Sequence, residues 1–171
     1  MNELEIMELM NSINYGWIDK LGQKHFEDFE DFLSQYILQS PRQLIKSKLG
    51  VCWDQVELER YYFNKINKNV ETFFIVYYDN KIFPTHTFLT FKRGNKYCWF
   101  EHSWERFRGI YEYNTKEELL LDVRKKFCEF ELSNKFDKNN LKIFKYDKPK
   151  YNISVNQFFK HCETGISVNK I

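Results

Sequence analysis

The chain has 171 residues, and its 26 basic and 24 acidic residues leave a formal charge of only +2. Charges so nearly balanced create no strong field toward nucleic acid or an acidic membrane surface, so neither is an expected partner. The length suits a single domain over residues 1–171, and an aromatic content of 19% indicates that rings fill much of its core.

Neither export nor a disulfide framework is expected. The N-terminus is acidic and lacks the basic and apolar regions of a cleaved signal, and no stretch approaches the roughly 18 apolar residues of a membrane span. The four cysteines are widely spaced and form no Cys-x-x-Cys pair: Cys52, Cys98, Cys128 and Cys162. We expect a cytoplasmic protein with free thiols and no cofactor.

The first part of the chain, residues 1–66, is predicted to be helical. Apolar residues recur at helical spacing around residues 4–10 and again over residues 26–37. Ser40, Pro41 and Gln43 combine a capping hydroxyl, a proline suited to the first helical position and an amide that reaches back to the cap. They predict a short helix towards Leu49, ended by Gly50.

A further helix is predicted from Cys52 to about Ile66, and from residue 71 the periodicity changes. Residues 72–78 form an almost unbroken β-branched and aromatic run, as expected of a central strand covered on both faces. Residues 85–91 and 96–102 follow as two more strands, and the sequence KRGN between them has the composition of a hairpin turn. An antiparallel sheet over residues 71–104 is therefore expected.

The C-terminal part, residues 115–165, is predicted to contain two helices and a strand. Thr115 and Glu118 form a capping box before an amphipathic helix that ends near residue 132. A strand is expected over residues 141–146, and Ser154 caps a last helix. The predicted fold class is α+β, with a central helix that begins at Cys52 packed on a small antiparallel sheet.

Cys52 is the candidate nucleophile. It follows Gly50 at the predicted start of a helix, where the macrodipole and the unpaired amides favour a thiolate over a thiol. The alternative for any single cysteine is a small buried hydrophobe.

The predicted hairpin supplies partners for this thiol. With a two-residue loop at Arg93 and Gly94, or a four-residue loop over residues 92–95, His86 directly opposes Glu101. A carboxylate there can orient the imidazole and stabilise its protonated form. A three-residue loop would bring Phe100 or His102 opposite instead, so His102 is the alternative third residue.

Three motifs together resemble the transglutaminase-like domains of the papain-related superfamily. Residues 40–54, SPRQLIKSKLGVCWD, are similar to the nucleophile region, in which a capped helix leads to Gly-x-Cys-x-Asp. Residues 84–88, PTHTF, resemble the histidine strand, and Glu101 lies close to the position of the third residue. The chain departs from the family in having Glu101 in place of the usual aspartate and Phe88 where a tryptophan is common.

The resemblance implies a papain-like α+β core and a thiol acyl-transfer enzyme with the triad Cys52, His86 and Glu101. Cys52 would attack an amide or ester carbonyl, and His86 would move the proton. The Cys52 amide is one candidate oxyanion donor, whereas Gln39, Gln23 and Trp17 remain open as the second. Hydrolysis of a peptide or protein substrate is expected, ahead of glutamine deamidation or cross-linking, because the short chain has little material to hold two proteins.

Two other interpretations use the same residues. A zinc site could combine Cys52, His86, Cys98 and His102, but the short paired spacings of closed zinc sites are absent. A non-catalytic member of the fold could instead bind a peptide or protein in a groove lined by Trp17, Trp53, Trp99 and Trp104. Residues 104–113 either border the cleft or form a solvated connection. The oligomeric state is left open.

Overall fold

A computed structural model describes residues 1–79, 83–132 and 135–168, and it confirms the α+β class. The described part contains six α-helices: α1 (Glu3–Met10), α2 (Phe32–Gln35), α3 (Pro41–Ser47), α4 (Cys52–Lys65), α5 (Lys116–Glu131) and α6 (Val155–Glu163). Two short 3-10 helices are η1 (Glu105–Phe107) and η2 (Lys138–Asn140). None of the helices in these ranges combines the length and apolar character that a membrane span needs.

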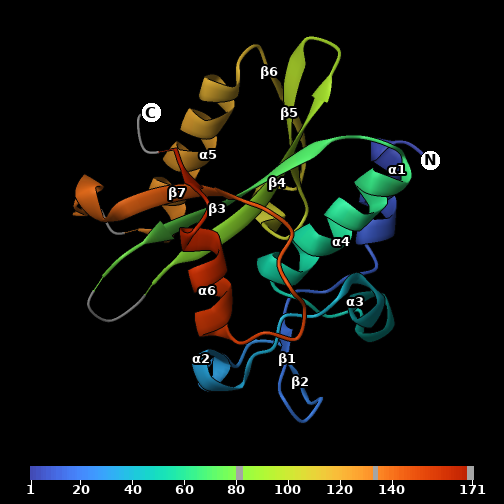
Figure 1. Cartoon of the computed structure of the whole chain (residues 1–171), viewed down its shortest axis with the longest axis vertical. Helices are drawn as coiled ribbons and strands as arrows, with labels where there is room; N and C mark the ends of the chain where they lie inside the picture. The colour runs from blue at the N-terminus through green and yellow to red at the C-terminus, as the bar shows by residue number, and fades with distance from the viewer. Residues whose placement is uncertain (80–82, 133–134, 169–171) are drawn as a thin grey trace.

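The main sheet has six strands in the order β6-β5-β4-β3-β7-β8, and every neighbouring pair is antiparallel. Its strands are β3 (Val70–Tyr77), β4 (Thr85–Arg93), β5 (Lys96–Glu101), β6 (Gly109–Tyr113), β7 (Leu141–Tyr146) and β8 (Ile166–Ser167). A separate two-stranded sheet pairs β1 (Trp17–Ile18) with β2 (Lys24–His25), and Figure 1 shows it at the lower end of the molecule. The sheet is thus larger than the predicted one.

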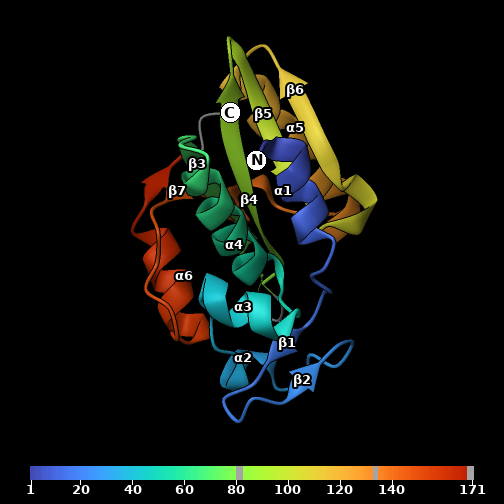
Figure 2. The same ribbon diagram turned by 90° about the vertical axis from the view of Figure 1, so that its right-hand side faces the viewer.

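Helices cover both faces of this sheet. Figure 2 shows α4 in front of it and α5 behind it. Alternation along the central strand β3 explains the two layers, because Phe74 and Val76 belong to the core on the α4 side, whereas Phe73 and Ile75 belong to the core on the α5 side. The unbroken apolar run of β3 therefore reflects burial on both faces, as predicted.

Local capping signals correctly placed most helices. Ser40 accepts a hydrogen bond from the Gln43 amide while the Gln43 side chain accepts one from the Ser40 amide, which starts α3. Thr115 and Ser154 begin α5 and α6 with the same reciprocal arrangement. These pairs are confirmed because both of their members lie within one helical turn and need no distant contact.

Two local predictions are wrong, and one strand was not predicted. Residues 26–37 form only the four-residue α2, because the chain on either side of it lies against other elements rather than in a helix: His25 pairs with Trp17 and Ile37 with Ser154. Helix α3 ends at Lys48, which is left-handed with φ of 55°, and not at Gly50. Residues 104–113 are no mere connection, since their second half is β6, hydrogen-bonded to β5.

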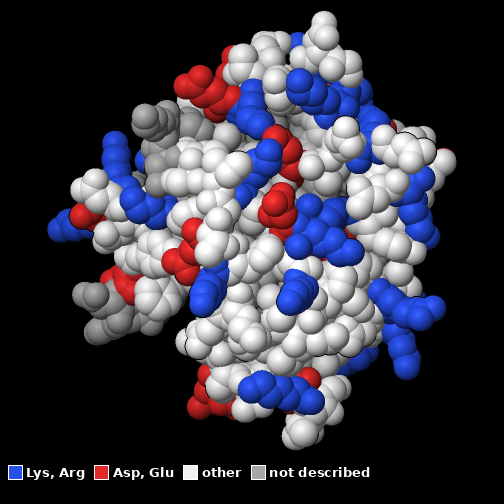
Figure 3. Space-filling view, in the orientation of Figure 1, with Lys and Arg blue, Asp and Glu red and all other residues white. Residues whose placement is uncertain are grey.

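Charged side chains are distributed over the surface. On the face drawn in Figure 3, Lys and Arg side chains are scattered, with acidic and uncharged groups between them. Some partly buried charges form ion pairs, as Lys126 does with Asp122 and Lys145 with Glu71. This distribution follows from the alternation of both charge signs along the sequence.

The start of α4 is fixed by Asp54. One carboxylate oxygen accepts hydrogen bonds from the Tyr36 hydroxyl at 2.9 Å and the Gln39 amide at 2.8 Å, and the other accepts one from the Val51 amide at 3.1 Å. Burial raises the pKa of Asp54 to about 7, even though these donors act in the opposite direction. Asp54 thus ties two loops to the first turn of the helix.

Replacing Asp54 with Ala should destabilise the protein by about 3 kcal/mol, because three buried donors lose their acceptor. Urea unfolding followed by circular dichroism would measure the change. Asp31→Ala is the matched control, since Asp31 is exposed and its side chain caps no helix. Equal stability of the two variants would contradict the role given to Asp54.

Candidate active site

Cys52 is the first residue of α4, as predicted, and its side chain is 5% exposed. The turn before it requires a glycine. A Cβ on Gly50 would lie 2.7 Å from Leu44 Cδ1 and 2.8 Å from Asp54 Cβ, closer than such atoms approach. Gly50 therefore allows α3 to pack closely against the start of α4. It does not terminate α3. The Cys52 sulfur lies where the amides of a first helical turn have no acceptor within the helix.

His86 and Glu101 form a buried pair. His86 Nε2 lies 2.7 Å from Glu101 Oε2, and both side chains are almost fully buried. The other carboxylate oxygen accepts hydrogen bonds from the Ser103 hydroxyl at 3.1 Å and the Trp104 amide at 2.8 Å. Glu101 is thus held from both sides, and the His86 ring orientation is fixed by a carboxylate that cannot rotate freely.

The predicted pair forms, but the predicted register is wrong. The turn residues are Gly94 and Asn95, and Arg93 pairs with Lys96, so β5 is displaced by two residues from the predicted alignment. Continued along the strands, this register puts Phe88 rather than His86 opposite Glu101. A displacement of two residues leaves every side chain on its original face, and the longer glutamate spans the diagonal to His86.

Cys52 completes the arrangement around His86. Burial lowers the pKa of the imidazole, but the Glu101 carboxylate and a hydrogen bond with the Cys52 side chain outweigh it and raise the pKa to about 10. Because Glu101 occupies Nε2, the remaining nitrogen, Nδ1, is the one available to the thiol. The imidazole therefore interacts with both a thiol and a carboxylate, which is the combination of groups in a cysteine triad.

His102, the alternative third residue, belongs to a different contact. Its Nδ1 lies 2.6 Å from Gln55 Oε1, and Gln55 in turn donates to the Gly50 carbonyl at 2.8 Å. Burial, with the nearby Arg108, lowers the pKa of His102 to about 4, so its ring is neutral at ordinary pH. His102 braces the turn before Cys52, whereas Glu101 is the group that contacts His86.

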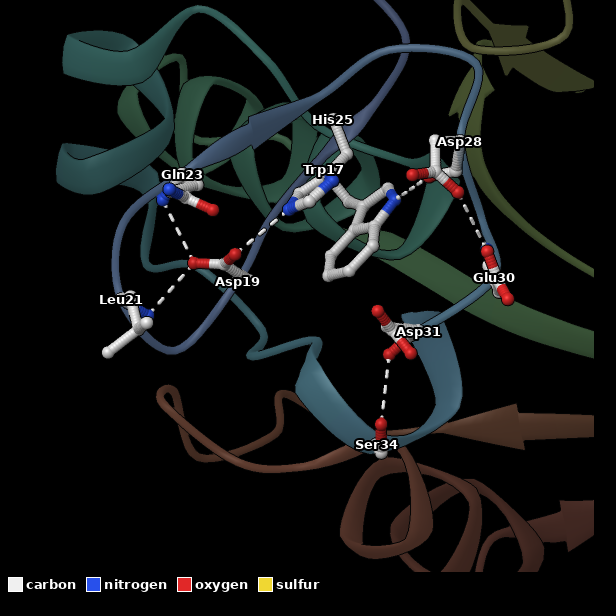
Figure 4. A network of polar contacts seen from close by, with 9 residues as sticks. All are labelled: Trp17, Asp19, Leu21, Gln23, His25, Asp28, Glu30, Asp31 and Ser34. Atoms are coloured by element: carbon white, nitrogen blue, oxygen red, sulfur yellow. Dashed lines mark hydrogen bonds and ion pairs between the residues drawn. The ribbon is translucent and has the colours of Figure 1, made fainter.

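The two proposed oxyanion donors with buried side chains point elsewhere. Gln39 donates from Nε2 to the Leu49 carbonyl at 2.8 Å. Trp17 donates from Nε1 to the Asp28 carbonyl at 2.7 Å. Figure 4 shows Trp17 beside the His25 ring, with centroids 4.1 Å apart, while His25 Nε2 lies 2.9 Å from Asp19. The contacts of Trp17, His25 and Asp19 hold the β1–β2 sheet together. Gln23, the third candidate, is exposed in the connection between β1 and β2.

A polar cavity of about 560 Å³ opens beside His86. Trp104, Ser103 and Arg108 line it, so the segment after β5 does border the site. Tyr15 lines it as well, from the loop between α1 and β1. The sequence alone gives Tyr15 no role, because only the tertiary structure brings it to the cavity beside His86. Cys52 is not among the described residues that line the cavity, so its sulfur is reached past His86.

A second carboxyl group is buried near the triad. Glu59 lies two turns after Cys52 on α4, and its Oε2 has no hydrogen-bond partner within the described residues. Burial raises the pKa of Glu59 well above its usual value, and the Glu101 charge raises it further. Glu59 is thus a second buried carboxyl group near His86 whose charged form is disfavoured by burial.

The arrangements required by the two competing interpretations do not form. Within residues 1–79, 83–132 and 135–168, no three His, Cys, Asp or Glu side chains could together hold a metal ion. All four cysteines are free thiols. Trp17, Trp53 and Trp99 are core residues rather than the lining of a groove, and only Trp104 reaches the cavity.

Comparisons with known proteins give no match: no protein-family model fits the chain, and no curated protein has a similar sequence. The resemblance to transglutaminase-like domains therefore stays a prediction that rests on the residues themselves.

The protein should become less stable as the pH rises, because the His86–Glu101 pair loses its proton. The folded pKa of about 10 exceeds the value near 6.5 of an unfolded histidine, so this stabilisation is complete below about pH 6.5 and is lost as the pH rises to about 10. Glu101→Gln should flatten this fall, whose limiting slope is about 1.4 kcal/mol per pH unit.

Urea unfolding across this pH window would measure the effect. Glu117→Gln, a change at an exposed carboxylate on α5, is the control and should keep the wild-type slope. A Glu101→Gln slope equal to that of the wild type would show that the pair does not stabilise the fold.

Proposed function

We propose that this protein is a thiol-dependent acyl-transfer enzyme that hydrolyses a peptide or amide bond with Cys52 as nucleophile. The single observation that carries the proposal is the buried His86–Glu101 pair at 2.7 Å, whose imidazole has a pKa raised by both the Glu101 carboxylate and Cys52. A cysteine at a helix start with an oriented imidazole is the arrangement that nucleophilic thiol catalysis needs.

The chemistry follows from these positions. Cys52 attacks the substrate carbonyl as a thiolate, while His86 carries the proton as an imidazolium stabilised by Glu101. Collapse of the tetrahedral intermediate transfers that proton to the leaving amine and leaves a thioester on Cys52. His86 then accepts a proton from water, which attacks the thioester and releases the acid.

Several features support a dedicated site rather than a chance contact. Glu101 is held by Ser103 and Trp104, so the orienting group is itself oriented. The Trp104 ring lies against the imidazole, with centroids 4.8 Å apart, and shields it from water. The cavity beside His86 gives a substrate carbonyl a route to the triad.

Hydrolysis is favoured over cross-linking because the cavity is modest and one substrate at a time fills it. A cavity of about 560 Å³ suits a peptide segment or a single amide side chain. Deamidation of a glutamine side chain uses the same steps, with ammonia as the leaving group, and it differs only in the substrate that the cavity admits.

Turnover of peptide, glutamine and ester substrates should be abolished by Cys52→Ala and retained by Cys128→Ala. Iodoacetamide should also label Cys52 of the wild type faster than Cys128, which is a half-buried thiol on α5. Mass spectrometry of the labelled peptides would measure the two rates. Equal turnover by wild type and Cys52→Ala, or equal labelling of the two thiols, would refute the enzyme assignment.

A further inference from the structure

The loop that carries Tyr15 is fastened to the turn that carries Cys52. Asn14 donates from its amide to the Lys48 carbonyl at 2.9 Å and accepts a hydrogen bond from the Gly50 amide at 3.1 Å. These two bonds make a short parallel bridge between Asn14 and Leu49. The residue after Asn14 is thus presented beside the residues that immediately precede the nucleophile.

Gly16, which follows Tyr15, allows this loop to lie close to Leu49. A Cβ there would lie 2.5 Å from the His25 carbonyl oxygen and 2.7 Å from Leu49 Cδ1, and the φ of +154° is rare for other residues. The Tyr15 ring is braced by Phe29, with centroids 6.3 Å apart. The position of Tyr15 is therefore determined by backbone contacts and not by a freely moving loop.

The Tyr15 side chain is the candidate for the second oxyanion donor. It lines the cavity beside His86, although 49% of its surface is exposed. Loss of hydration raises the pKa of Tyr15 most, and negative charge on Cys52 raises it next. Its hydroxyl makes no hydrogen bond within the described residues.

Gln39 and Trp17, the buried side chains considered for this role, donate to backbone carbonyls instead. The Cys52 amide, first in its helix, has no intrahelical acceptor and supplies one donor. A tetrahedral intermediate needs at least one further donor aimed at its oxygen. Tyr15 is a donor without a partner at the same cavity.

We propose that the Tyr15 hydroxyl is a catalytic residue that donates a hydrogen bond to the oxyanion formed when Cys52 attacks the substrate carbonyl. In that step the carbon–sulfur bond forms and the carbonyl π electrons move to oxygen, where Tyr15 and the Cys52 amide stabilise the charge. The leaving group then departs with a proton from His86, and the carbonyl re-forms as a thioester. This assignment rests on the proposed function.

The test compares two reactions of the same sulfur. Acetylation by p-nitrophenyl acetate passes through an oxyanion, whereas alkylation by iodoacetamide is a direct displacement that forms none. Tyr15→Phe removes only the hydroxyl from a half-exposed ring, so the variant should fold, and its melting temperature would verify this. Tyr61→Phe, at an exposed ring towards the end of α4, is the matched control.

We expect Tyr15→Phe to slow acetylation of Cys52 on the order of 100-fold while the alkylation rate changes less than about twofold. Tyr61→Phe should leave both rates unchanged. The assignment is overturned if Tyr15→Phe acetylates at the wild-type rate, or if both of its reactions slow equally, since the hydroxyl would then act on the thiolate. A wild type that gains no acetyl group on Cys52 would instead overturn the proposed function, and this assignment with it.

Discussion

The first turns of α4 are buried on all sides, from Cys52 to Arg60, and five of these nine side chains are polar or charged. A buried polar group without a partner costs several kcal/mol, so most of these side chains are paired: Glu57 with Arg60 within the helix, and Asp54 and Gln55 with other parts of the fold. Asp54 takes its donors from the loop before α3 and from Val51, and Gln55 joins His102 to Gly50. The hydrogen bonds that these buried polar side chains require therefore fix the positions of the surrounding loops and of the β4–β5 hairpin.

The candidate site is a consequence of that arrangement. The same turn that Asp54 and Gln55 fasten holds Cys52 at the helix start, and the strands that cover α4 end beside it with His86 and Glu101. Glu59 is the member of the helix that keeps an unpartnered oxygen, and burial disfavours its charged form.

Helices and strands specified by neighbouring residues were predicted correctly from the sequence, whereas those that depend on contacts with distant segments were not. The caps at Ser40, Thr115 and Ser154 and the central strand β3 are confirmed, because neighbouring residues alone specify them. Residues 26–37 have helical spacing but contribute only one turn of helix, because backbone pairing with other segments overrides a spacing that short. Strand β6 was missed because its pattern gains meaning only beside β5.

From the sequence alone, the start of α4 at Cys52 and the pairing of His86 with Glu101 could be derived, since strand alternation keeps both side chains on one face even when the register moves by two residues. Only the tertiary structure decided which groups surround them. In the folded protein Gln39 and Trp17 donate to backbone carbonyls, His102 contacts Gln55, and Tyr15 lines the cavity beside His86. The physical reason is that alternation along a strand is set by the backbone within a few residues, whereas side-chain partners depend on contacts between segments far apart in the chain.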